Sequence, residues 1–78
     1  MITISTAIKF AMRNKTSLSF MEKAGCYHCM EIIDVKDIVE WTDQGETALC
    51  PKCHVDAVLP DASLTQVQLK EIHEYWFN

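Results

Sequence analysis

The spacing of apolar residues predicts a helix over residues 5–24, a segment without Pro or Gly. Its apolar side chains recur at helical intervals and would form one buried stripe: Ala7, Phe10, Ala11, Leu18 and Met21. Asn14 interrupts this stripe, and the poor helix formers that follow it indicate a break near residues 14–17. Gly25 would end the helix.

Two shorter features are expected in the middle of the chain. Residues 34–42 are predicted to form a short helix that Asp34 caps. Its buried side would consist of Val35, Ile38, Val39 and Trp41. The flanking stretches "MEII" (30–33) and "ETAL" (46–49) are predicted to pair as an irregular β-hairpin.

The last segment carries the clearest pattern. Ser63 and Gln66 fit a capping box, which predicts a helix over residues 64–77. Its apolar face would carry Leu69, Ile72 and Trp76. The chain therefore contains about three helices and one short hairpin.

Length and composition indicate one domain over residues 1–78, because so short a chain cannot build two cores. Hydrophobic residues make up 49% of the chain, which is too many for a disordered protein. A core of this size contributes only about 3–5 kcal/mol, so a metal ion or a disulfide is expected to support it.

A net charge of −4 argues against a general role in nucleic-acid binding, which needs clustered Lys and Arg. A local basic patch would provide an alternative, and its members would be Lys9, Arg13, Lys15 and Lys23. The first three also interrupt any apolar signal segment, and no apolar run reaches the length of a membrane span. We therefore expect a cytoplasmic protein without a membrane segment.

Four cysteines form two matched pairs, Cys26-x-x-Cys29 and Cys50-x-x-Cys53. Two thiolates at this spacing can face one ion when the backbone turns tightly between them, so the pattern predicts a tetrahedral zinc site. An iron–sulfur cluster and a disulfide are the alternatives, but common cluster spacings differ and disulfides require an oxidising compartment. Four thiolates close the coordination shell, so one structural Zn²⁺ per chain is expected, with no catalytic role.

Three polar residues near the cysteines suggest a second possibility. His28 lies inside the first pair, and His54 and Asp56 follow the second. These side chains could form another metal site, as in HNH-like nucleases, but the stretch lacks the further His and Asn of that motif. Outward-facing side chains and a turn cap at Asp56 are the simpler interpretation, and His73 would be a surface or boundary residue.

The cysteine pairs and their surroundings resemble a family of small bacterial cytoplasmic proteins whose biochemical role is unassigned. The resemblance covers residues 20–78 and is carried by Cys26, Tyr27, Cys29, Ile38, Glu40, Trp41, Thr47, Ala48, Leu49, Cys50, Pro51, Cys53, Asp56, Val58, Trp76 and Phe77. It implies zinc binding by the four cysteines in a treble-clef or zinc-ribbon-like arrangement. Position 54, a His here, is commonly Gly in that family, and His28 replaces a common Tyr.

Together these observations predict a small α-rich zinc-bound domain with two cysteine knuckles. Its expected function is non-enzymatic: a protein-interaction module, such as an adaptor, an inhibitor or an immunity-type protein. The acidic charge suits a basic protein partner, and surplus aromatic residues, including Tyr27, could mark the contact surface. A nucleic-acid-binding regulator is the alternative, and an HNH-like nuclease is the third candidate.

Overall fold

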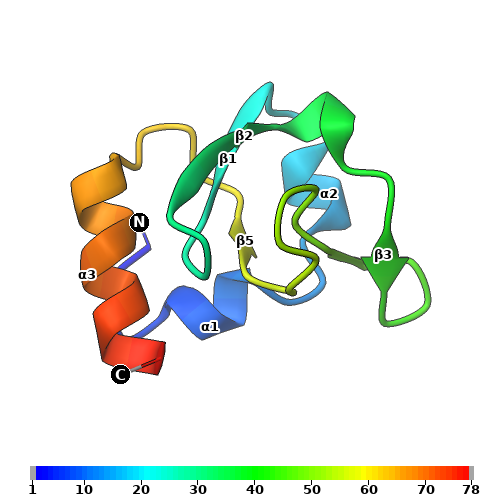
Figure 1. Ribbon diagram of the computed structural model, residues 1–78. Helices are drawn as coiled ribbons and strands as arrows, with labels where there is room; N and C mark the ends of the chain where they lie inside the picture. The colour runs from blue at the N-terminus through cyan, green and yellow to red at the C-terminus, as the bar shows by residue number, and fades with distance from the viewer. Residues whose placement is uncertain (1, 78) are drawn as a thin grey trace.

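The structure is a computed structural model and describes residues 2–77. Helices lie at both ends of this range, and short strands lie between them (Figure 1). In chain order the elements are α1 (Ala7–Phe10), α2 (Lys15–Leu18), β1 (Lys23–Cys26), β2 (Glu31–Asp34), the 3-10 helix η1 (Val35–Asp37), β3 (Trp41–Thr42), β4 (Thr47–Ala48), β5 (Val58–Leu59) and α3 (Gln66–Phe77).

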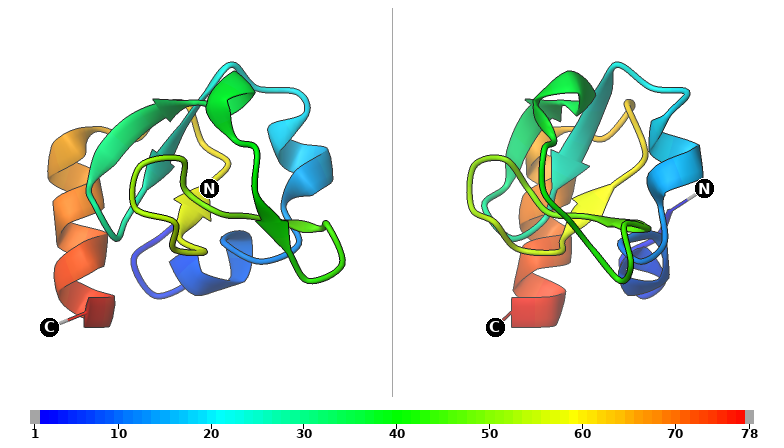
Figure 2. Two further views of the ribbon diagram at one scale, coloured as in Figure 1. Left: turned by 45° about the vertical axis from the view of Figure 1, so that its right-hand side comes forward. Right: turned by 90° about the vertical axis from the view of Figure 1, so that its right-hand side faces the viewer.

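Two small antiparallel sheets organise the middle of the chain. The larger has the order β2-β1-β5, with Cys26 of β1 opposite Glu31 on one side and Val58 on the other. The smaller sheet consists of β3 and β4. The two further views show α3 on one side of the larger sheet and α2 on the other side of the molecule (Figure 2).

Helix α3 confirms the prediction for the end of the chain. Leu69 and Ile72 are buried, and Trp76 packs against the core and donates its indole N–H to the Ile4 carbonyl at 2.8 Å. The cap differs from the expected one. Thr65 and Gln68 exchange side-chain-to-backbone hydrogen bonds of 3.2 and 2.9 Å, so the capping box begins two residues after Ser63.

Gly25 lies in β1 and does not end a helix, so this prediction was wrong. A Cβ atom at this position would lie 2.9 Å from Cδ2 of the buried Leu69. Glycine therefore allows α3 to approach the sheet closely.

The expected helix over residues 5–24 was also wrong in its extent, since the segment forms two helices of 4 residues and then enters β1. Asn14, which is buried, accounts for the break. Its amide nitrogen donates to the carbonyls of Phe10 (3.2 Å) and Val58 (2.8 Å), and its side-chain oxygen accepts from the N–H of Ala48 (3.1 Å). These bonds to distant backbone groups fix the chain direction, which outweighs helix propensity.

The middle of the chain also differs from the prediction. Residues 34–42 contain the end of β2, the 3-10 helix η1 and part of β3 in place of an α-helix. The abundant β-branched residues there favour extended backbone. Val39, expected to be buried, is exposed, whereas Ile38 is buried as expected.

The predicted hairpin between 30–33 and 46–49 does not form. Strand β2 pairs instead with β1, its neighbour across the first cysteine pair, and β4 pairs with β3. Strands that are close in sequence pair with a smaller loss of loop-closure entropy, which favours these partners.

Over residues 2–77 the fold is therefore mixed α/β, with three α-helices of 4, 4 and 12 residues and small antiparallel sheets, and it is not clearly α-rich. Within residues 2–77, no helix has the length and apolar character that a membrane crossing requires.

Replacing Asn14 tests its role in joining α2 to two strands. The substitution Asn14→Ala should lower the free energy of unfolding by about 2–4 kcal/mol, because it leaves the buried Val58 carbonyl and Ala48 N–H without partners. Chemical denaturation of the metal-loaded protein measures this change. The control Ser17→Ala, at an exposed position of α2, should stay within about 0.5 kcal/mol; equal effects of the two changes would contradict the assigned role.

Candidate metal centre

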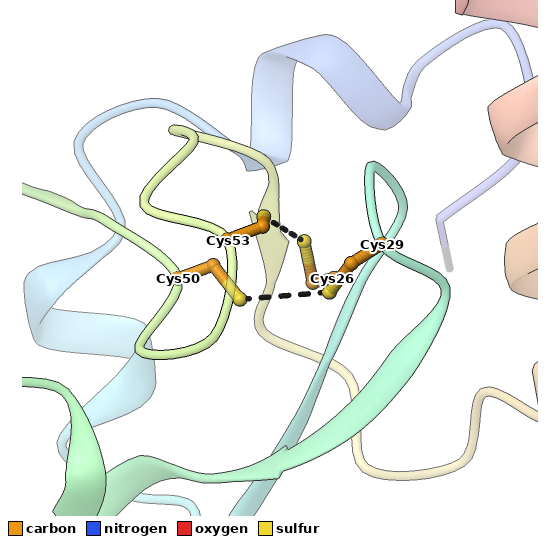
Figure 3. Close-up of side chains that lie close together, drawn as sticks. All are labelled: Cys26, Cys29, Cys50 and Cys53. Atoms are coloured by element: carbon orange, nitrogen blue, oxygen red, sulfur yellow. Dashed lines mark hydrogen bonds between the residues drawn. The ribbon is translucent and has the colours of Figure 1, made fainter.

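Two tight turns carry the four cysteines. Cys26 is the last residue of β1, and Cys29 lies in the turn that leads into β2. Cys50 and Cys53 lie in a turn between β4 and β5, which a hydrogen bond from the Cys50 N–H to the Val55 carbonyl closes at 3.0 Å. The close-up shows both turns directing their sulfur atoms toward a common centre (Figure 3).

The two turns share a backbone feature. Met30 and His54, each directly after the second cysteine of a pair, have φ values of 62° and 64°. This left-handed conformation suits glycine best and is tolerated by few other residues. The two cysteine turns therefore end in the same backbone conformation.

The sulfur positions fit one tetrahedral metal ion. The Sγ atoms of Cys26 and Cys53 are 3.6 Å apart, those of Cys29 and Cys50 are 3.7 Å apart, and all four lie within 4.8 Å of one another. Metal–sulfur bonds of about 2.3 Å in a regular tetrahedron place the sulfurs about 3.8 Å apart. A disulfide would bring two sulfurs to about 2.05 Å. The four cysteines are accordingly free thiols in a geometry for one ion.

An iron–sulfur cluster fits this geometry less well. Its cysteine ligands are divided among two or four irons, which sets thiolates on different irons farther apart than the edges of a single-ion tetrahedron. All four sulfurs lie within 4.8 Å of one another, which is too close for thiolates on separate irons. Among borderline-soft ions, zinc is the one that an all-thiolate tetrahedral shell suits best.

Backbone N–H groups donate hydrogen bonds to the cysteine sulfurs. Those of Cys29 and His28 lie against the Cys26 sulfur, and that of Glu31 lies against the Cys29 sulfur. In the second turn, the Lys52 N–H reaches the Cys50 sulfur at 3.4 Å. Such donors stabilise thiolates, the form of cysteine that binds metal.

Burial opposes this effect. It raises the pKa of Cys26 far above its ordinary value and raises the pKa of Cys29 to about 11. Burial also acts to raise the pKa of Cys50, but the N–H groups of Cys53 and Lys52 and the adjacent thiols outweigh it, and the pKa of Cys50 is lowered. A cation at the centre would compensate the cost of several buried negative sulfurs.

One ion pair connects the two turns at the surface. Lys52, inside the second cysteine pair, lies with its Nζ 3.4 Å from the carboxylate of Glu31, just after the first pair. Both side chains are exposed, so the pair contributes little to stability.

The structure does not bring His28, His54 and Asp56 together as metal ligands. Within residues 2–77, the four cysteines are the only group of three or more candidate ligand atoms close enough to share an ion. His54 is exposed, and its Nδ1 lies 2.9 Å from the Glu40 carboxylate. The expected turn cap at Asp56 is not formed either, since its exposed carboxylate makes no hydrogen bond among the described residues.

His28 and His73 take part in a contact that sequence reasoning missed. The ring centroid of Phe77 lies 5.0 Å from that of His28 and 5.3 Å from that of His73. The Nδ1 of His73 lies 3.0 Å from the Tyr27 carbonyl, to which it donates in the matching tautomer. These contacts fasten the end of α3 to the first cysteine turn. The i, i+4 spacing of His73 and Phe77 was the available signal, but nothing in the sequence indicated the partner.

Neither family models nor curated proteins nor solved structures give a match to the chain, so no family is identified and the assignment of the site rests on its geometry.

Substitutions at His54 test whether backbone conformation, and not imidazole chemistry, governs this position. His54→Gly should leave the free energy of unfolding unchanged within about 1 kcal/mol or raise it, because glycine adopts φ > 0 freely. His54→Val should destabilise, because a β-branched residue is strained there. Thermal denaturation of both metal-loaded variants measures the difference, and a stable His54→Val protein would show that the strain argument fails.

Proposed function

We propose that the chain binds one structural zinc ion through Cys26, Cys29, Cys50 and Cys53 and acts as a non-enzymatic domain that recognises another protein. The sulfur–sulfur distances of 3.6 and 3.7 Å carry the metal assignment, because they match the edge of a zinc–thiolate tetrahedron. The two turns with equivalent left-handed residues support it.

The positions of the turns favour a zinc-ribbon-like arrangement over a treble clef. The first pair lies between two paired strands, and the second pair precedes β5 instead of opening a helix. Helix α3, the long helix of the fold, contributes none of the four cysteines. The zinc ion would therefore join two β-turns and position the helix only indirectly.

The ligand set supports a structural role for the metal. Four thiolates complete a tetrahedral shell, whereas catalytic zinc keeps one position open for water or substrate. Two of the four sulfur-bearing residues, Cys26 and Cys50, are fully buried, which restricts access to the centre. The chemistry that the ion would supply is thus cross-linking of the two turns.

Charge and exposed apolar area favour a protein partner over nucleic acid. The net charge is −4, and two basic side chains of the larger sheet and the second turn, Lys23 and Lys52, are paired with Asp34 and Glu31. Large exposed apolar side chains are numerous for so small a domain: Ile4, Ile8, Phe10, Met12, Phe20, Ile32, Val39, Val67, Tyr75 and Phe77.

Metal content and its link to folding test the first half of the proposal. Elemental analysis of the purified protein should give one zinc per chain, and a strong chelator should unfold the chain, because the core is small and the ion holds both turns. Cys50→Ser should have the same effect, as circular dichroism would show. The matched control His54→Gly, at a neighbouring residue that is not a ligand and whose left-handed backbone glycine adopts freely, should bind zinc and fold normally. A chain that folds fully without metal would contradict the structural role.

Binding measurements separate the protein-recognition proposal from nucleic-acid binding. Fluorescence anisotropy with labelled single-stranded RNA and double-stranded DNA should show no binding at about 50 mM salt, where electrostatic contacts are strong. Salt-sensitive binding that is lost on combined replacement of Lys9, Arg13 and Lys15 would favour the nucleic-acid function instead.

A further inference from the structure

A groove with a volume of about 250 Å³ lies beside the metal centre and is not explained by metal binding. Helix α1, the exit of the second cysteine turn and the last turn of α3 form its walls. Its main lining residues are Ile8, Met12, Tyr27, Val55, Asp56 and Phe77. Both orientations of the ribbon show α1 and the C-terminal end of α3 on the same side of the molecule (Figures 1 and 2).

The groove exposes apolar side chains from α1, from the residues that follow it and from α3. Met12 is 49% exposed, Phe77 is 44% exposed and Ile8 is 42% exposed. Tyr27, which is buried, also lines the groove, and its ring centroid lies 5.6 Å from that of Phe77. A flexible methionine in the same lining as an aromatic ring adapts to apolar side chains of different shapes, so this groove suits insertion of a partner's side chain.

Asp56 gives the groove a charge preference. It is the only charged residue in the lining, its side chain is exposed, and its carboxylate has no ion-pair partner among residues 2–77. The chain as a whole carries a net charge of −4. An occupant that presents a cation beside its apolar side chain would therefore be favoured over a neutral or acidic one.

The metal centre sets the shape of this groove. Tyr27 lies between Cys26 and Cys29, and Val55 and Asp56 follow Cys53. The Tyr27 N–H donates to the Ala57 carbonyl at 3.1 Å, which joins the walls contributed by the two cysteine turns. An ion that fixes both turns would hold the groove in its binding shape before a partner arrives, which lowers the ordering cost of binding.

We propose that this groove docks a short segment of a partner protein that carries an apolar anchor residue next to Lys or Arg. The inference rests on the proposed function, because it assigns the surface and the partner chemistry for that protein recognition. It makes the second cysteine turn both a metal-binding and a partner-binding element.

A random peptide library displayed on phage and selected on the zinc-loaded protein tests this assignment. Enriched peptides should combine an aliphatic or aromatic residue with a neighbouring Lys or Arg. Synthetic versions should lose at least about fivefold in affinity for Met12→Ser, and Asp56→Lys should reverse a preference for Arg-containing over Glu-containing versions. Val39→Ser, which removes an exposed apolar side chain outside the groove, should bind like the unmodified protein. Zinc content and thermal midpoint confirm that each variant is folded.

Several results would overturn the assignment. Failure to enrich any peptide, or enrichment of peptides without basic residues, would do so. Peptides that bind Met12→Ser and Asp56→Lys undiminished would place recognition on another face and leave the proposed function intact. Self-association of the chain in sedimentation measurements that Met12→Ser abolishes would identify a second copy as the occupant. Absence of zinc from the purified protein would instead reject the proposed function itself.

Discussion

The convergence of four sulfur atoms on one centre is the constraint on which the rest of the molecule depends. Two of the sulfurs come from the turn between β1 and β2, and two from the turn between β4 and β5. The central strand β1 is thereby tied to a segment more than twenty residues away, and β5 is brought against its other side. Without a compensating cation, several buried thiolates could not remain charged together, since burial favours the neutral thiol. The proposed ion therefore supports folding as well as coordination.

A second polar centre complements the metal site. The buried side chain of Asn14 binds backbone groups near α1, in β4 and in β5. It replaces the hydrogen bonds that a continuous first helix would have made. This domain has few large buried side chains. The four-cysteine site and the hydrogen bonds of the Asn14 side chain, which both require a defined geometry, therefore help to select a single arrangement of its short elements.

The sequence predicted the features that depend on local spacing and missed those that depend on distant partners. The cysteine pairs and the amphipathic pattern of Leu69 and Ile72 are local, and the structure clusters the four sulfurs and forms α3. The break at Asn14 was anticipated, but its cause lay in carbonyl and amide groups far along the chain. The helix expected at 34–42 failed because pairing of β2 with β1 and of β3 with β4 outweighed a plausible cap at Asp34. The contact of His28 with Phe77 likewise depends on tertiary packing that spacing cannot indicate.

The coordination shell offers the most direct test of this account. X-ray absorption at the zinc edge of the purified protein should show four sulfur neighbours at about 2.3 Å and no nitrogen or oxygen ligand. Such a spectrum would agree with the sulfur–sulfur distances and with a closed, structural site. A first shell that contains imidazole nitrogen would contradict it, because His28 or His54 would then be a ligand. A water oxygen in the first shell would contradict it as well, because one coordination position would then be open for chemistry.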